Sequence, residues 1–275
     1  MRMKQAKKAY LPSDLPKTRY AAFFDRLKMD PWRFLGLGGI LLAFALPMLI
    51  TGALRDFALF QNASESAPEA VFSISFYGAL IRIPGLMFFS LGLMGALRIL
   101  RQGCWDEPLF FGSDFFLGIK NGWSNALLHS FVLGALLFLA MLGRISGVYS
   151  SWVVGIFLGL IMFLIFPASF HSLFLSEIYA LPLFRNFRAG YTVSFHSYWK
   201  TLLISLFLLL PLVFLWIPSL LGRYLALALS LLLYYPLALL ASCLAAFSIY
   251  DPLINVKDYP ELVRKGLYQG EDENS

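Results

Sequence analysis

Six long apolar runs dominate the sequence and constrain its fold more than any other feature. A helix needs roughly 20 mainly apolar residues to cross a hydrocarbon core of about 30 Å. In hydrocarbon every backbone polar group must be satisfied internally, so a spanning run of this kind has to be helical. We therefore predict an all-α polytopic membrane protein with short cytoplasmic interfacial helices. Its six transmembrane helices are expected at residues 34–54, 76–97, 122–142, 150–175, 201–221 and 224–247.

The composition agrees with lipid as the solvent of this chain. Of its 275 residues, 59% are hydrophobic and 14% are charged, whereas soluble domains have roughly 45–50% apolar and about 25% charged residues. The formal net charge is +6, and the basic residues are spread along the chain instead of being concentrated in one domain. This pattern predicts membrane lipid as a partner and excludes nucleic acid.

The distribution of Lys and Arg predicts the orientation in the membrane. Eighteen of them fall in the N-terminal segment, the second-to-third loop, the fourth-to-fifth loop and the tail. All of these lie on one side of a six-span topology. The other side receives four: Arg55, Arg82, Arg144 and Arg223. Because loops rich in Lys and Arg stay in the cytoplasm, we expect both termini there.

Three regions follow from this topology. Residues 1–33 form an N-terminal segment without the apolar core and cleavage site of a signal peptide. Residues 34–250 form the transmembrane domain, and residues 251–275 form a solvated tail. The N-terminal segment is expected to contain an amphipathic interfacial helix. Its apolar face would carry Phe23, Phe24 and Leu27, with Asp25, Arg26 and Lys28 pointing away from that face.

The loop between the second and third runs, RILRQGCWDEPLFFGSDFFLGIKNGW, is unusual because its charges sum to zero. Ser113 can cap a short helix that starts at Asp114, whose carboxylate suits the positive end of the helix dipole. An apolar stripe at four-residue spacing would then line one face. We also predict that Arg98 and Arg101, which share a helix face, pair with nearby carboxylates. The stripe is Phe111, Phe115, Ile119 and Trp123, and the carboxylates are Asp106, Glu107 and Asp114.

This loop carries a resemblance to a known family. The residues resemble the YesL-like family of small bacterial integral membrane proteins, first in an L-P-x-x-x-x-G pattern at Leu46, Pro47 and Gly52. The resemblance implies an association with carbohydrate uptake systems, the bacterial cytoplasmic membrane as the location, and no catalytic activity. Cys104 and Trp105 depart from the pattern, which favours more polar residues there. The loop residues that match are Arg98, Arg101, Glu107, Pro108, Phe110, Asp114, Phe115, Phe116 and Lys120.

Three functions compete. The first is a non-catalytic accessory or regulatory subunit of a carbohydrate ABC importer, which would contact the importer's permease and ATPase subunits. The second is a stand-alone transporter or channel, although few ionisable residues lie deep in the runs. The third is a membrane enzyme, for which no catalytic motif is present. We favour the first and expect no cofactor. The partner-docking and scaffold residues would be Arg98, Arg101, Glu107, Asp114, Phe115, Phe116 and Lys120, with Arg185 and Arg188 as a second surface.

Two further features of the sequence have more than one interpretation. His129 and His171 are weak metal-site candidates because Glu177 could join them, but such histidines usually bond other groups between helices. The tryptophans Trp123 and Trp199 each precede a Leu-rich run near a lysine. This similarity between the two segments is explained either by an internal repeat or by the ordinary preference of membrane boundaries for Trp and Lys. Cys104 and Cys243 are expected to stay free thiols.

Overall fold

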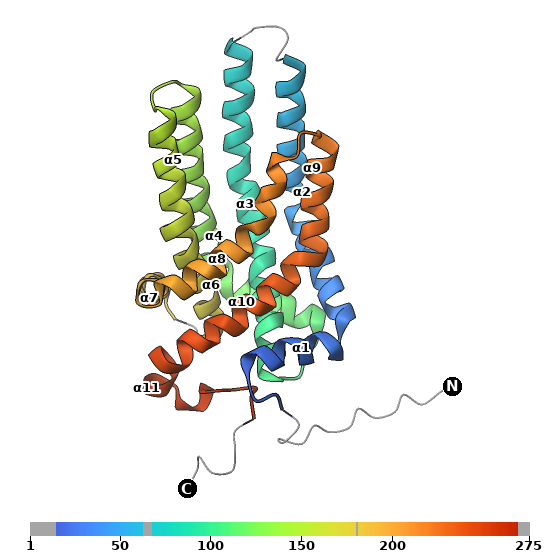
Figure 1. Ribbon diagram of the computed structural model, residues 1–275, viewed down its shortest axis with the longest axis vertical. Coiled ribbons are helices and arrows are strands. Elements are labelled where there is room, and N and C mark those ends of the chain that lie inside the picture. Colours follow the sequence, from blue (N-terminus) through green and yellow to red (C-terminus); the bar gives the residue numbers. More distant parts are fainter. Residues whose placement is uncertain (1–14, 63–67, 180, 269–275) are drawn as a thin grey trace, which may run out of the picture.

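A computed structural model describes residues 15–62, 68–179 and 181–268, and every regular element in these ranges is helical. Figure 1 shows long helices running along one axis and shorter ones gathered at the end where both termini lie. The elements are α1 (Arg19–Met29), α2 (Pro31–Asn62), α3 (Pro68–Trp105), α4 (Phe111–Ile145), α5 (Ser151–Leu160), η2 (Ile161–Ile165), α6 (Phe166–Tyr179), α7 (Leu183–His196), α8 (Tyr198–Leu209), η3 (Leu210–Trp216), α9 (Leu220–Leu229), η4 (Ser230–Tyr234), α10 (Tyr235–Tyr250), η5 (Asp251–Asn255), α11 (Val256–Asp258) and η6 (Pro260–Leu262).

Six helical segments are long and apolar enough to cross a membrane, which confirms the prediction of an all-α polytopic membrane protein. Each matches one of the six predicted runs, with two differences: the fourth begins at Ser151, one residue late, and the fifth ends before Ile217 and Pro218 instead of continuing to residue 221. The segments are Pro31–Asn62, Pro68–Trp105, Phe111–Ile145, Ser151–Tyr179, Tyr198–Trp216 and Leu220–Asp258. Their apolar outer surfaces make lipid the natural neighbour of this protein.

Both ends of the described chain lie on the same face of the bundle. The amide of Tyr268 donates a hydrogen bond to the carbonyl of Pro16, with 3.1 Å between the atoms. The short helices α1, α7 and α11 lie at this end as well (Figure 1). We call this end the terminal face, and the other end, where α2 joins α3, the opposite face.

One predicted helix start is wrong, and one helix continues beyond its predicted end. No separate helix starts at Asp114, because α4 runs without a break from Phe111 into the third span. The sixth segment continues to Asp258, so the first residues of the predicted tail are helical. By contrast α7 and α8 are separate helices that meet at Ser197. Trp123 therefore lies inside α4 while Trp199 lies in the first turn of α8, and the two similar segments differ in local structure.

The N-terminal helix α1 is present, but it is rotated relative to the prediction. Its buried positions are Ala22 and Arg26, while Phe24 is exposed. Phe23 and Leu27 are partly buried against the core. The predicted outward orientation of Arg26 is thus wrong, because an ion pair described below draws this side chain inward.

Prolines follow π-helical turns in the fourth and sixth segments, and the sixth segment bends there (Figure 1). A proline has no N–H for the carbonyl four residues earlier and its ring clashes with that carbonyl. Pro167 follows the π-helical turn η2, and Pro236 follows the π-helical turn η4. In Figure 1 α9 runs along the bundle, whereas α10 crosses it obliquely. The bend at η4 brings α10 beneath the other spans.

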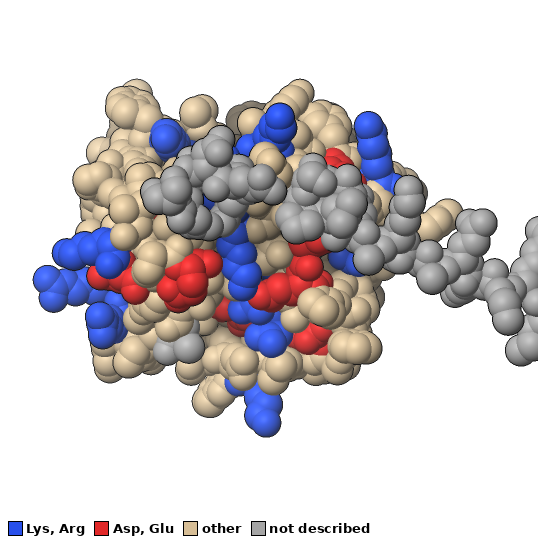
Figure 2. Space-filling view, turned by 90° about the horizontal axis from the view of Figure 1, so that it is seen from below, with Lys and Arg blue, Asp and Glu red and all other residues tan. Residues whose placement is uncertain are grey.

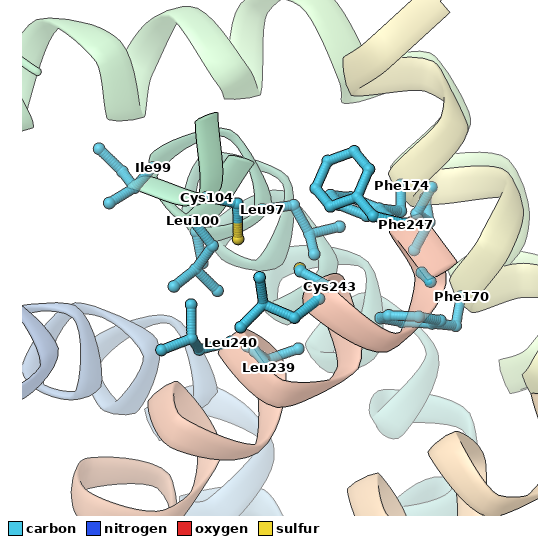
Figure 3. Close-up of a cluster of buried hydrophobic side chains, with 14 of the residues drawn as sticks. Leu97, Ile99, Leu100, Cys104, Phe170, Phe174, Leu239, Leu240, Cys243 and Phe247 are labelled. Carbon is cyan, nitrogen blue, oxygen red and sulfur yellow. The ribbon is translucent and has the colours of Figure 1, made fainter. Parts of the chain in front are cut away.

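The core lies where α3, α6 and α10 meet, in the half of the bundle next to the terminal face. Figure 3 shows Leu97, Leu100, Phe174 and Phe247 converging there, with Cys104 and Cys243 among them. Both cysteines are buried free thiols. Cys104 is therefore a core residue, and this explains why an apolar side chain stands at this position of the loop.

The C-terminal segment docks against the end of α3. Gly266 has φ +79° and lies against the backbone of Cys104, where a Cβ atom would be 2.0 Å from the carbonyl oxygen. Glycine accepts both the left-handed conformation and the close approach. Leu267, next to it, is buried in the core.

Candidate functional site on the terminal face

The two arginines at the end of α3 converge on α6. The guanidinium Nη1 of Arg98 is 3.7 Å from Oε2 of Glu177, which is an ion pair too long to be a hydrogen bond. Arg101 donates from Nη1 to the backbone carbonyl of Glu177 over 2.6 Å. The Glu177 side chain is 1% exposed, so a buried carboxylate faces the guanidinium of Arg98 while Arg101 holds the backbone of the same residue.

Arg101 also joins α3 to the loop that follows and to the tail. Its Nη2 lies 3.4 Å from Oε2 of Glu107, and the other carboxylate oxygen of Glu107 is 2.7 Å from Nζ of Lys265. Both cations lie over the ring of Trp105, Arg101 at 4.9 Å and Lys265 at 4.1 Å from its centroid. Cations stack favourably on indole faces. Trp105 thus serves as a platform for two cations, which accounts for its departure from the expected polar residue.

Helix α1 is fastened to the same face by two further ion pairs. Arg26 pairs with Asp106, which has a positive φ of 58° in the turn after α3. Arg19 pairs with Asp251 at 2.9 Å and donates to the carbonyl of Lys265, also at 2.9 Å. We call these ion-paired residues together the terminal-face network: Arg19, Arg26, Arg98, Arg101, Asp106, Glu107, Glu177, Asp251 and Lys265.

The terminal-face network joins α1, α3, α6, η5 and the tail, which are far apart in the sequence. Figure 2 shows acidic side chains in the middle of this face with Lys and Arg beside them, and more basic side chains projecting at its rim. Opposite charges that neutralise one another locally can hold segments together. These ion pairs link the segments of the terminal face to one another.

Ser113 does not cap a helix as predicted, whereas the carboxylate of Asp114 lies in the first turn of α4, at the helix end where it was predicted. The carboxylate of Asp114 accepts a hydrogen bond from the amide of Phe110 over 2.7 Å, and it forms no ion pair with another described residue. The hydroxyl of Ser113 donates to the carbonyl of Phe110, so Ser113 lies in the first turn of α4 and is not its cap. Asp114 is the residue that satisfies an amide at this helix end, as the helix dipole favours.

The remaining predicted site residues divide between core and surface. Phe115 is 2% exposed and lies against Gly95 of α3 and the ring of Phe44. Phe116, the next residue, is 67% exposed. The basic side chains of Lys120 in α4 and of Arg185 and Arg188 in α7 are exposed as well. The predicted constellation is thus split, with Arg98, Arg101, Glu107 and Phe115 used internally and these other groups available to a partner.

The two histidines do not meet at a common site. His129 contacts the hydroxyls of Ser169 at 3.3 Å and Ser172 at 2.7 Å. His171 contacts the hydroxyls of Tyr250 at 2.7 Å and Thr201 at 3.0 Å. Within the described ranges, no three His, Cys, Asp or Glu residues are grouped closely enough to hold a metal ion. Each histidine therefore acts as a hydrogen-bonding link between helices.

The structure adds a buried polar cluster that sequence reasoning missed. Nδ2 of Asn186, in α7, lies 3.1 Å from Oδ1 of Asn125 and 2.7 Å from the carbonyl of Ser172. The rings of His129 and Phe187 stack with 5.2 Å between their centroids. Single polar residues in two apolar runs and an asparagine in the loop between the fourth and fifth runs gave the only signal, and nothing in their spacing indicated that α4, α6 and α7 bring them together. We call Asn125, His129, Ser169, Ser172 and Asn186 the intramembrane polar cluster.

Comparison with known proteins gives no relative. No family model, curated protein or solved structure matches this chain. The resemblance to the YesL-like family therefore stays a prediction from the loop residues, and the function has to be argued from the geometry.

Removal of the Arg26 side chain should loosen α1. In Arg26→Ala the carboxylate of Asp106 loses its partner, and we expect a loss of about 1–3 kcal/mol in the local free energy of opening. Hydrogen–deuterium exchange should then rise in α1 and around Asp106. Lys28→Ala, an exposed lysine on the same helix, is the matched control. Equal exchange in both variants would contradict an anchoring role for Arg26.

Proposed function

We propose that this protein is a non-catalytic accessory or regulatory subunit of a carbohydrate ABC importer in the bacterial cytoplasmic membrane. In this proposal the terminal face is cytoplasmic, as the excess of Lys and Arg on that side of the spans favours. The partners would be the permease and ATPase subunits of the importer. The proposal rests on the resemblance of the loop and on the architecture of the terminal face.

The observation that supports it most is that some charged side chains of the terminal face are paired with one another while others are exposed. The residues of the terminal-face network form ion pairs with one another and so hold α1, the 106–110 turn and the tail together as one platform. Beside this platform several exposed groups are basic or aromatic, among them Lys120, Arg185, Phe116 and Phe184. Exposed Arg and aromatic side chains are the residue types that anchor protein interfaces. A fixed surface that presents them suits a binding role.

A second candidate, a stand-alone transporter, is favoured by one observation. The intramembrane polar cluster places an amide, an imidazole and two hydroxyls inside the spans, with the amide of Asn186 in α7 bonded to them, and polar groups at such positions often mark transport paths. The π-helical turns in the fourth and sixth segments add to this, since interrupted helices frame many transport sites. All the same, the groups of this cluster bond mainly one another, which also suits helix packing.

The docking proposal predicts the effect of reversing the exposed charges. The triple variant Lys120→Glu, Arg185→Glu and Arg188→Glu should reduce recovery of importer subunits about tenfold or more in a mild-detergent pull-down followed by mass spectrometry. Charge reversal in an interface both removes attraction and adds repulsion. Because the three side chains are exposed, the thermal midpoint of the variant should stay near that of the wild type.

The matched control reverses three other exposed lysines on the terminal side of the bundle: Lys28, Lys200 and Lys257. It changes the net charge by the same amount and should leave recovery intact. If both triple variants lose the partner equally, general electrostatics is responsible and the docking site is wrong. If the wild-type protein is recovered alone, the accessory-subunit proposal fails, and liposome transport assays would test the second candidate.

A further inference from the structure

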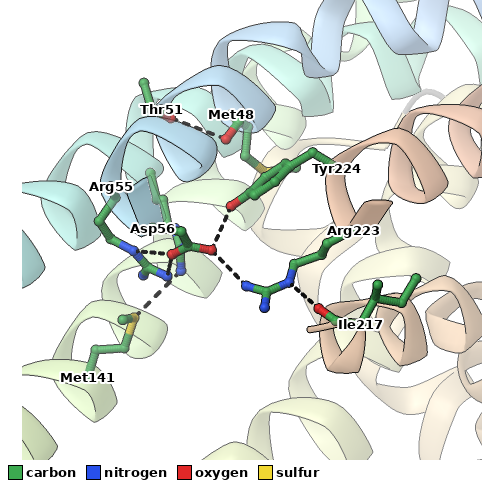
Figure 4. A network of polar contacts seen from close by, with 9 residues as sticks. Met48, Thr51, Arg55, Asp56, Met141, Ile217, Arg223 and Tyr224 are labelled. Atoms are coloured by element: carbon green, nitrogen blue, oxygen red, sulfur yellow. Dashed lines mark hydrogen bonds and ion pairs between the residues drawn. The ribbon is translucent and has the colours of Figure 1, made fainter. Parts of the chain in front are cut away.

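The opposite face holds a cluster of arginines that the proposed function does not use. Arg55 belongs to α2, Arg82 to α3 and Arg223 to α9. Figure 4 shows Arg55, Arg223 and Tyr224 converging on one carboxylate, that of Asp56. Arg82 is close enough to interact electrostatically with Arg55, Asp56 and Tyr224. We call these five residues the opposite-face arginine cluster.

The hydrogen bonds and ion pairs within this cluster leave part of its positive charge unneutralised. Arg55 donates from Nε to Oδ1 of Asp56 at 2.9 Å and also from Nη2. On the other carboxylate oxygen, Nη1 of Arg223 and the hydroxyl of Tyr224 each donate at 3.0 Å. A single carboxylate thus receives four donors, and its capacity to neutralise further cations is used up.

Arg82 is the arginine without a carboxylate. Within the described residues its one hydrogen-bond contact is with the sulfur of Met141, 3.8 Å from Nη1, and a thioether is a weak acceptor. Arg55 Nη1 and Arg223 Nη2 likewise have no hydrogen-bond partner in the described part of the chain, although none of these nitrogens is sealed from the surroundings. Three guanidinium groups face one carboxylate, so the cluster carries a net charge of +2.

Charge of this kind is costly near hydrocarbon. The side chains of Arg55, Asp56 and Arg223 are only 15%, 13% and 23% exposed, so water screens the excess poorly. Gly78 of α3 leaves room for the Arg55 side chain, because a Cβ atom at position 78 would lie 2.5 Å from Cδ of Arg55. A bound anion would offset the excess and use the free N–H groups.

The place of the cluster indicates the source of that anion. Arg223 donates from Nε to the carbonyl of Ile217 at 3.1 Å. The preceding residue, Trp216, is 87% exposed, and exposed tryptophans of membrane proteins gather at the headgroup level. Guanidinium groups bind phosphate oxygens through paired hydrogen bonds.

We propose that the opposite-face arginine cluster binds a phosphate oxyanion, with Arg82 and the free N–H groups of Arg55 and Arg223 as donors. The source argued for is the phosphodiester of an anionic lipid headgroup. Asp56 and Tyr224 do not touch the anion in this arrangement. They orient Arg55 and Arg223 so that their remaining donors point to one place.

The test uses the full protein in phosphatidylcholine nanodiscs and measures its thermal unfolding midpoint. One arm replaces phosphatidylcholine stepwise by phosphatidylglycerol, and the other adds glycerol phosphate to the buffer. We expect a saturable rise of the midpoint in the lipid arm. In Arg82→Ala the lipid concentration that gives half the rise should increase about tenfold or more, the effect of losing a charged hydrogen-bond donor.

Two further variants make the result decisive. Arg144→Ala removes an exposed arginine at the end of α4 on the same face and should keep the full rise. Arg82→Lys should recover part of it, because the charge returns without the fork of donors. A rise in the glycerol phosphate arm alone would support the oxyanion site and assign it to a soluble phosphate. An unchanged response of Arg82→Ala in both arms, or equal losses in Arg82→Ala and Arg144→Ala, would overturn the proposal.

Discussion

Gly38→Ala should prevent this protein from folding to its normal stability, whereas Gly39→Ala should be tolerated. Gly38, in α2, faces the π-helical turn η4. A Cβ atom there would lie 1.9 Å from the carbonyl oxygen of Leu232 and 2.7 Å from its carbonyl carbon. Both obstacles are backbone atoms, so no side-chain rotation relieves the clash and one helix has to move.

The close contact follows from the proline that comes next. Pro236 has no N–H to offer to the carbonyl of Leu232, four residues earlier. That carbonyl lies against the backbone of α2 instead, where only a glycine leaves room. Overpacking in a core costs about 1–3 kcal/mol and occasionally more, and we expect the upper end here because backbone has to shift.

Gly39 supplies a control one residue away. A Cβ atom at Gly39 has no neighbour within 4 Å. Alanine is the better helix former by about 1 kcal/mol, so Gly39→Ala should be neutral or slightly stabilising. The measurement is the thermal midpoint and the monodisperse yield of each variant in the same detergent. Equal stability of the two variants would show that α2 and η4 do not approach as closely as the structure has them.

The second large effect is expected at Glu177. In Glu177→Ala the guanidinium of Arg98, whose side chain is 14% exposed, loses its only ion-pair partner in the described chain. Breaking a buried pair from one side costs about 3–5 kcal/mol, because the other charge stays buried without compensation. Unfolding in detergent, followed by tryptophan fluorescence, should show this loss.

A double variant separates charge from packing at the same place. Arg98→Met with Glu177→Leu removes both charges and keeps the volume roughly constant, so much of the lost stability should return. Glu261→Ala removes an exposed carboxylate and should change little. Wild-type stability in Glu177→Ala would mean that the Arg98 charge is compensated from outside the protein, and the pair would then lose its structural role.

Part of the terminal-face network could be predicted from the sequence. Arg101 and Glu107 are six residues apart around the end of a helix, so their ion pair follows from local geometry. The partner of Arg98 was predicted among the loop carboxylates and is instead Glu177, 79 positions away. Lys265 and Glu107 are 158 positions apart. Contacts of that range depend on which helices become neighbours, and no spacing in the sequence encodes this.

The sequence by itself determined the fold class and the number of spans, because a helix is the structure in which each apolar run of this length satisfies its own backbone in lipid. It also determined that both ends of the chain lie on one face, since six crossings are an even number. The tertiary structure alone decided three other features. The side chain of Arg26 points inward, α4 begins at Phe111, and Asp56 lies among three arginines. Burial against lipid is a property of each segment, whereas these contacts are properties of pairs of segments.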